Sequence, residues 1–250
     1  MKRVLVTGGG AGIGRAIVDR FISAGDKVLT CDIGPVELNA GREARPDLVA
    51  VPCDISNPEQ VDRLFTAATQ HLGGLDVLVA NVGIGGPTLP ADELPLADWQ
   101  QVMDVNLTGT FDVTRRAIPL LKQSRGTIVI MSSAAGRLGY PNRLPYAVSK
   151  WGLVGMAKTL AAELGEYGIS ANAILPGAVG GERFERVIEG RAALSGRSFE
   201  DEMMAGFGNQ SLKQVVEPGH VADLVHFLTT PAGRSISGAA LPIDNDLQRG

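Results

Sequence analysis

Tyr146 and Lys150 lie four residues apart in the stretch NRLPYAVSKWGL, and a helix would set their side chains next to each other. A tyrosine with a pKa of about 10 is a poor base at neutral pH, and a neighbouring cation favours its phenolate form. The pair could therefore exchange a proton with a bound molecule. Taken alone, a pair with this spacing is more often an ordinary contact on a helix surface. Other parts of the chain have to decide between the two interpretations.

The glycine-rich stretch TGGGAGIG at residues 7–14 has a composition that suits a phosphate. Glycines let the backbone turn tightly and approach a pyrophosphate, and a helix that begins there offers N–H groups and the positive end of its dipole. Gly8, Gly12 and Gly14 follow a G-x-x-x-G-x-G spacing instead of the general G-x-G-x-x-G dinucleotide pattern. Such a turn is a weak signal by itself, but its place between a strand and a helix favours a nucleotide site.

Asp32 closes the second apolar run, 18 residues after Gly14. An acidic residue about 20 residues beyond a glycine-rich turn commonly binds the ribose hydroxyls of an adenosine. Because a carboxylate would repel a 2′-phosphate, Asp32 predicts NAD(H) as the cofactor over NADP(H). The alternative is a solvated aspartate at the end of a strand.

The elements that must hold these residues alternate between strand and helix patterns. RVLVTG, GIGRAIVDRFISAG and KVLTCDI form a strand–helix–strand unit, and further apolar runs bring the expected strands to seven. Ser56 and Glu59 are spaced as a capping box that opens a helix through about Leu72, and Asp98 can cap a long helix. Continuous apolar strands predict a doubly wound α/β fold, with a seven-stranded parallel sheet between two helical layers.

No linker or shift in composition divides the chain, so residues 1–250 are predicted to form a single domain. Residues 179–214 differ from the rest because they are polar and poorly periodic. A long segment of this kind in a compact domain is commonly a lid or a disordered loop. We expect it to be a substrate lid.

The bulk composition excludes several classes of partner. The net charge is −4 with a pI of about 5.4, and the basic residues are scattered, which argues against nucleic acid and anionic membranes. No apolar run is long enough for a membrane span, and the N-terminus does not resemble a signal peptide. Cys31 and Cys53 have no metal-ligand or disulfide spacing and suit small buried thiols, so we expect a cytoplasmic protein without a metal.

Six motifs in order, TGGGAGIG, NVG, VMDVNLTG, IVIMSS, YAVSK and ILPGAV, resemble the single-domain, NAD-type branch of the short-chain dehydrogenase/reductase family. The resemblance covers the chain up to residue 179. It implies a Rossmann fold and an NAD-dependent alcohol dehydrogenase or carbonyl reductase. It also implies homotetramers or homodimers, with the helices from about Asp98 and about Tyr146 at one interface.

The resemblance implies a catalytic tetrad. The serine of the family precedes its tyrosine by 13 residues, which selects Ser133 over Ser132, and Asn106 is the fourth member beside Tyr146 and Lys150. In the implied mechanism Tyr146 takes the proton of a secondary alcohol as hydride leaves for the nicotinamide. Ser133 holds the substrate oxygen, Lys150 binds the nicotinamide ribose, and Asn106 holds a water that relays protons. The alternatives are a turn-capping hydroxyl for Ser133 and a buried amide bonded to backbone for Asn106.

The same resemblance implies a set of cofactor contacts. Beside Gly8, Gly12, Gly14, Asp32, Tyr146 and Lys150, they are Ile13, Asp54, Ile55, Asn81, Gly83, Pro176, Gly177 and Val179. Two departures from the family stand out. Ala80 and Val82 replace two positions of the N-N-A-G pattern, and Gly180-Gly181 stands where a threonine usually meets the carboxamide of the cofactor.

Substrate contacts are expected near the carboxyl ends of the strands, at Ala135, Arg137, Asn142, Arg143 and Arg183. Arginines can grip an anion through two bonds, so the substrate is predicted to be a small polar or anionic secondary alcohol or ketone. For any single arginine, plain surface solvation is the simpler explanation. Two other functions share parts of the pattern: an NAD-binding regulator without turnover, and an epimerase or dehydratase of nucleotide sugars. The intact tetrad disfavours the first, and the short C-terminal region disfavours the second.

Overall fold

A computed structural model describes residues 1–34 and 48–248, apart from the side chain of Arg183. Seven strands form one parallel sheet in the order β3-β2-β1-β4-β5-β6-β7. The strands are β1 (Arg3–Thr7), β2 (Lys27–Asp32), β3 (Val49–Pro52), β4 (Val77–Ala80), β5 (Thr127–Met131), β6 (Ser170–Pro176) and β7 (Ala240–Ile243). The predicted doubly wound α/β fold is confirmed.

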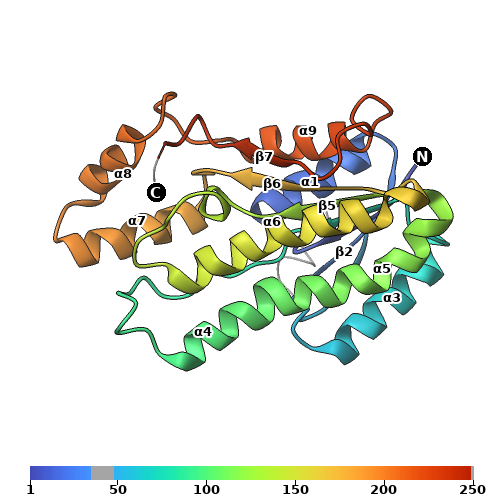
Figure 1. Ribbon diagram of the computed structural model, residues 1–250, viewed down its shortest axis with the longest axis horizontal. Coiled ribbons are helices and arrows are strands. Elements are labelled where there is room, and N and C mark those ends of the chain that lie inside the picture. The colour runs from blue at the N-terminus through green and yellow to red at the C-terminus, as the bar shows by residue number, and fades with distance from the viewer. Residues whose placement is uncertain (35–47, 249–250) are drawn as a thin grey trace.

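Helices cover both faces of the sheet, as Figure 1 shows. One face carries α3 (Pro58–Leu72), α5 (Thr110–Ser124) and α6 (Leu144–Leu164), and the other carries α1 (Gly12–Ser23) and α9 (Pro218–Leu228). Each face of the sheet has its own hydrophobic core, and successive residues of a strand point to opposite faces. In β1, Leu5 packs toward α3 and α5, while Val4 and Val6 pack toward α1 and α9. None of the described helices combines the length and apolar character needed to cross a membrane.

The start of α3 differs from the predicted capping box. Asn57, not Ser56, is the cap: its side-chain oxygen accepts hydrogen bonds from the backbone N–H groups of Glu59 at 3.0 Å and Gln60 at 3.2 Å. Ser56 instead donates to Asp54 at 2.7 Å. Pro58 is the first helical residue, where its fixed φ and missing N–H fit well, and this moves the cap one residue along the chain.

The long helix predicted to begin at Asp98 is also different in detail. It begins as α4 (Leu96–Met103) after Pro95, so Asp98 lies inside the first turn and is not the cap. A π-helical segment, η1 (Asp104–Gly109), then joins α4 to α5. A π turn holds one extra residue and is frequent at functional sites, and this one contains Asn106.

Residues 179–214 contain two helices, α7 (Glu182–Ser195) and α8 (Phe199–Gly208), and not a long structureless loop. Gly196 ends α7 with a left-handed φ of 72°, and the Ser198 hydroxyl caps α8. Most of their residues are partly or fully exposed, so their apolar periodicity is weak, which explains why the sequence did not predict helices. Figure 1 shows both helices at one end of the molecule, beyond β6.

The opposite end of the sheet is tied by an ion pair between Arg3 of β1 and Asp76, which precedes β4. The guanidinium donates to both carboxylate oxygens, at 2.9 and 2.7 Å, and the Arg3 backbone N–H adds a bond of 2.7 Å. These bonds, the side-chain bond from Arg3 first, hold the pKa of Asp76 below its usual range. A lowered carboxyl pKa stabilises the fold above the ordinary pKa, and that contribution is lost as the pH falls.

We expect Asp76→Asn to lower the free energy of unfolding by about 1 kcal/mol, because the side chains are partly exposed and water screens the pair. The difference from wild type should shrink as the pH falls below about 4, the ordinary pKa of an aspartate in the unfolded chain, and should vanish below the lowered pKa of Asp76 in the fold. Urea unfolding at neutral and acidic pH measures both effects. Asp223→Asn is the control. It removes the carboxylate that pairs with Arg20, which is more exposed than Asp76, so it should change stability less. Equal losses at both pH values would contradict this account.

Candidate active site

The parallel sheet brings the predicted site residues to one edge. In a parallel sheet all carboxyl ends lie at the same edge, which is where such folds bind ligands. Gly8 follows β1, Asp32 ends β2, Asn81 follows β4, Ser133 lies just beyond β5, and Gly177 follows β6. Residues that are far apart in the chain therefore surround one region.

The glycine-rich turn after β1 cannot hold larger residues. Gly8 has a left-handed φ of 69°, and its N–H donates to the Cys31 carbonyl at 2.7 Å. A Cβ at Gly14 would lie 1.9 Å from the Gly8 carbonyl oxygen, and one at Gly9 would lie 2.0 Å from the Thr30 hydroxyl. The turn is thus packed tightly against β2 and against the first turn of α1.

The start of α1 suits a pyrophosphate. No side chain of the described residues caps this helix end, so its first N–H groups point at a region where a phosphate could accept them. Asn81 holds the turn in place through bonds from its amide nitrogen to the carbonyls of Thr7 and Gly8, at 3.1 and 3.0 Å. These residues fit the phosphates of a dinucleotide.

Asp32 lies at the same edge and is itself part of the turn. One carboxylate oxygen accepts the Gly10 N–H at 3.0 Å, and the other accepts the Ile33 N–H at 2.8 Å. The side chain is only half-buried, so its remaining acceptor positions face the region beside the turn. An adenosine ribose could use them.

Tyr146 and Lys150 lie on the first turns of α6, as predicted. The Lys150 ammonium is 5.7 Å from the centre of the Tyr146 ring. The lysine is buried, with 3% of its surface exposed, and it donates to the Met131 carbonyl at 2.9 Å. The tyrosine is half-buried. A buried cation beside a partly accessible phenol favours the phenolate, because burial removes the water that would screen the charge.

The two neighbouring serines have different environments. The Ser132 hydroxyl is buried and donates to the Lys150 carbonyl at 2.7 Å, so it is a link between β5 and α6. Ser133 is half-buried, and its hydroxyl oxygen accepts the Ala135 N–H at 3.2 Å. Ser133 therefore caps the next turn, yet its hydroxyl proton remains able to bind a ligand.

Asn106 is completely buried and bonds to backbone. Its amide oxygen accepts the Ile84 N–H at 2.7 Å, and its amide nitrogen donates to the Ile84 carbonyl at 2.9 Å and to the Ser149 hydroxyl at 3.0 Å. Ser149 in turn donates to the Tyr146 carbonyl at 2.7 Å. Sequence reasoning did not single out Ser149, although a serine beside Lys150 on an otherwise apolar helix was a usable signal. A Cβ at Gly83 would lie 3.1 Å from the Lys150 ammonium, so this loop packs directly on the group.

The remaining predicted cofactor residues lie around this edge. Asp54 accepts hydrogen bonds from Ser56, and Ile55 is buried against η1, where a Cβ at Gly109 would meet its carbonyl oxygen at 2.7 Å. Gly177 packs on Asp244, and Val179 forms a parallel bridge with Val216. The list is completed by Ile13, which is half-buried at the start of α1, and Pro176, which is buried at the end of β6.

The predicted substrate residues have diverse surroundings. Arg137 binds the buried carboxylate of Asp244 at 2.6 Å and the Leu247 carbonyl at 2.6 Å, so these contacts connect the turn after β5 to β7. Ala135 is completely buried, and Asn142 is exposed with a left-handed φ of 59°. Arg143 is buried beside Tyr146. The side chain of Arg183 lies outside the described residues.

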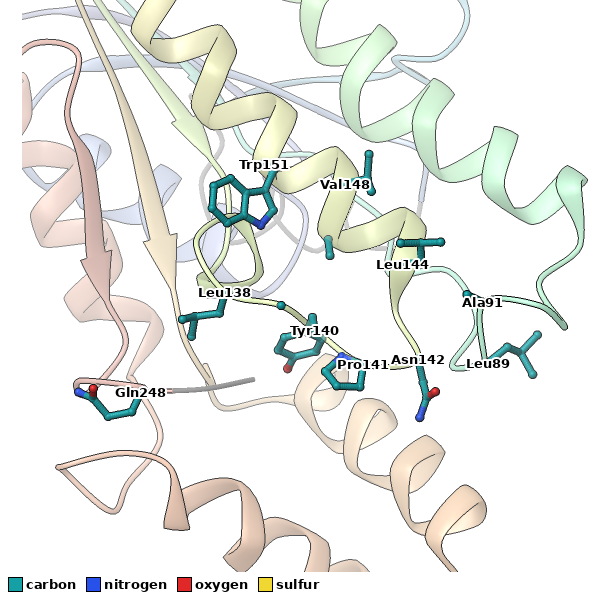
Figure 2. A pocket seen from close by; sticks show the side chains of 12 residues that line it. Leu89, Ala91, Leu138, Tyr140, Pro141, Asn142, Leu144, Val148, Trp151 and Gln248 are labelled. Atoms are coloured by element: carbon teal, nitrogen blue, oxygen red, sulfur yellow. The ribbon is translucent and has the colours of Figure 1, made fainter.

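An apolar cleft borders the first turns of α6, and Figure 2 shows the side chains that line it. Leu144, Val148 and Trp151 come from α6, while Leu138 and Tyr140 come from the loop before it. Asn142 also lines the cleft, as does Gln248 near the C-terminus. The sequence predicted this loop as substrate-binding but missed Trp151 and Gln248. Among the described residues, no group of three His, Cys, Asp or Glu side chains could hold a metal ion.

Comparisons with known proteins agree with this geometry. The family model described as short chain dehydrogenase matches residues 2–191. The 3-oxoacyl-[acyl-carrier-protein] reductase MabA of Mycobacterium tuberculosis is 32% identical over 250 residues, which cover all of this chain and 94% of that protein. No comparison supports a protein without catalytic activity.

Solved structures give the same result. An NAD⁺-bound xylitol dehydrogenase superposes with a TM-score of 0.94 at 27% identity, covering 98% of each chain. A variant of the actinorhodin polyketide ketoreductase with NADPH superposes with a TM-score of 0.92 at 30% identity, covering 97% of this chain and 95% of that one. The two neighbours carry different cofactors, so the likeness leaves NAD and NADP both open. The chain belongs to the short-chain dehydrogenase/reductase family, and it is an oxidoreductase that transfers hydride between a nicotinamide cofactor and an alcohol or ketone.

Proposed function

We propose that this protein is an NAD(H)-dependent dehydrogenase of a secondary alcohol, or reductase of the matching ketone, with Tyr146 as the group that exchanges the proton. The observation that carries the proposal is the buried Lys150 ammonium, 5.7 Å from the centre of the half-buried Tyr146 ring, at the sheet edge that also holds the glycine-rich turn.

The residues would divide the work as follows. Bound NAD supplies the acceptor for hydride, or the donor in the reverse direction. Tyr146 removes the alcohol proton, and the charge of Lys150 favours the phenolate that does so. Ser133 keeps its proton and donates a hydrogen bond to the substrate oxygen. Asn106, held rigidly by Ile84 and Ser149, fixes the backbone beside Lys150 and supports a water that relays protons to it.

NAD over NADP is supported by Asp32. Its half-buried carboxylate lies at the end of β2, where the adenosine ribose of a cofactor on the turn would lie, and a negative charge there repels a 2′-phosphate. Residues 179–214, with α7 and α8, are proposed as the substrate lid. A small polar or anionic substrate is supported by the arginines of this segment, Arg183 and Arg186 among them.

A homotetramer or homodimer is proposed from exposed apolar side chains on neighbouring helices. Leu96 of α4 is 78% exposed, and Phe111 of α5 and Trp151 of α6 are each 52% exposed. Figure 1 shows α4, α5 and α6 on the same side of the molecule. A second copy could cover them. A cytoplasmic location is proposed because Cys31 and Cys53 are both free thiols.

Tyr146→Phe should lower kcat by a factor of about 10² to 10⁴, because the proton acceptor is lost while the ring is kept. Absorbance of NADH, followed with a panel of secondary alcohols, sugar acids and sulfonates, measures turnover. Stabilisation of the variant by NAD⁺ in a thermal-shift titration should match wild type, which separates chemistry from binding. Undiminished turnover in the variant would remove Tyr146 from the mechanism.

Asp32→Ala should reduce the NAD over NADP preference in kcat/KM about tenfold or more, because the carboxylate that would bind the ribose of NAD and repel the 2′-phosphate of NADP is lost. Asp32→Asn is the matched control, since its amide oxygen can still accept the Gly10 N–H and keep the turn in place. We expect the asparagine variant to lose selectivity with little loss of thermal stability. A wild-type preference for NADP would overturn the ribose argument.

Trp151→Glu should shift the protein toward smaller species in size-exclusion chromatography with light scattering, because a charge on a covered apolar face is costly to bury. Leu212→Glu changes a residue of similar exposure, 57%, on the loop after α8 and serves as the control. An unchanged mass for Trp151→Glu would exclude this face as the interface.

A further inference from the structure

Arg143 is the last residue before α6, and its side chain is buried, with 5% of its surface exposed. The carbon at the centre of its guanidinium is 5.2 Å from the centre of the Tyr146 ring. One guanidinium nitrogen donates to the Gly85 carbonyl at 3.2 Å. Buried arginines are uncommon because removing the charge from water is costly, so this position calls for an explanation.

Two cations lie near the ring of Tyr146. Lys150 follows Tyr146 by four residues, a spacing that places side chains on the same side of a helix, and Arg143 is the residue just before α6. The two charges are 5.2 and 5.7 Å from the ring centre, and both side chains are at least 95% buried. At such distances in a buried site an opposite charge favours the ionised form of a titratable group.

The surrounding backbone fixes the guanidinium. A Cβ at Gly85 would lie 2.4 Å from the Arg143 nitrogen, so the arginine fills the space that the glycine leaves. The Asn142 carbonyl accepts the Leu89 N–H at 2.9 Å, and the Arg143 carbonyl accepts the Ala147 N–H at 2.9 Å. The loop after β4 thus contacts the guanidinium, and the backbone hydrogen bonds fix the start of α6 that carries it.

Two described charged groups on elements packed around α6 have partners of their own. Asp104 of η1 accepts a hydrogen bond from Gln100 at 2.8 Å, and Arg137 after the 3-10 turn binds Asp244. Asp98 belongs to α4, not to α6, and lies in the first turn after Pro95. Among the described residues, the neutral Asn106 also lies close by, since it donates to the Ser149 hydroxyl, which in turn donates to the Tyr146 carbonyl.

We propose that Arg143 is a positioning residue that stabilises the phenolate of Tyr146 together with Lys150. The inference rests on the proposed function for the role of Tyr146. An arginine remains charged at every pH at which the protein is folded, whereas a buried lysine can lose its proton. Arg143 therefore supplies a constant positive field at the phenol, and in the direction of alcohol oxidation it favours the form of Tyr146 that accepts a proton.

The first experiment needs no turnover. The chain has three tyrosines, so ultraviolet difference titration of wild type minus Tyr146→Phe isolates the ionisation of Tyr146. We expect Arg143→Gln to raise the midpoint of this ionisation by about one pH unit or more. Arg143→Lys keeps the charge and should bring the midpoint most of the way back to the wild-type value. Arg191→Gln is the matched control, because Arg191 lies 5.1 Å from the ring of Tyr140 and should leave the Tyr146 midpoint unchanged.

A second variant keeps the test decisive if Arg143→Gln does not fold. Gly85→Ala retains the charge but displaces the guanidinium, and it should raise the same midpoint. An unchanged midpoint in the folded variants would overturn the proposal.

Kinetics distinguish this role from substrate binding. With a neutral alcohol, Arg143→Gln should shift the pH profile of kcat to higher pH by as many pH units as the midpoint of the titration. Arg143→Lys should shift the profile back toward that of wild type. A raised KM confined to anionic substrates, with an unshifted profile, would show that Arg143 binds substrate and would overturn the proposal. If wild type has no turnover with any alcohol, the proposed function fails, and the titration still decides whether Arg143 acts on Tyr146.

Discussion

The hydrogen bond from the buried Lys150 ammonium to the Met131 carbonyl is the contact on which the site depends. An ammonium removed from water is costly unless it finds partners, so this bond fixes both the lysine and the helix that carries it. Ser132 adds a bond in the opposite direction, from the end of β5 to the Lys150 carbonyl. Together they hold α6 against β5. The phenol of Tyr146, one turn earlier, then has a defined distance from the charge.

The loop after β4 is the second support of the site. Asn106 donates both amide hydrogens, to Ile84 and Ser149, and accepts the Ile84 N–H, and Gly83 leaves room for the lysine. The π-helical segment explains how a long helix can present an amide to this loop, since the extra residue changes which side chains face inward. Under the proposed function this inner framework would serve the chemistry. Substrate selectivity would then depend on the more exposed residues 179–214 and the cleft.

The parallel sheet brings the glycine-rich turn and the helix that carries Tyr146 to the same edge. Because its strands are parallel, the turn that suits a pyrophosphate and the helix that carries the phenol meet at one edge, although about 130 residues separate them. Asp32 bonds to the turn there, and in the proposed function it would also bind a ribose. One carboxylate would then couple cofactor selectivity to the shape of the turn.

The sequence by itself determined the seven strands, the doubly wound order and the positions of the glycine turn, Tyr146 and Lys150. These follow from apolar periodicity, from glycine spacing and from motif order, which are local properties of the chain. It missed α7 and α8, whose exposed faces give weak periodicity, and it placed the cap of α3 one residue early. Only the tertiary structure decided that Arg137 binds Asp244, that Asn106 bonds to Ile84 and that Arg143 lies beside Tyr146. Such contacts depend on which side chains share a buried space, and for Arg137 and Asn106 they join residues distant in the chain, which no local pattern records.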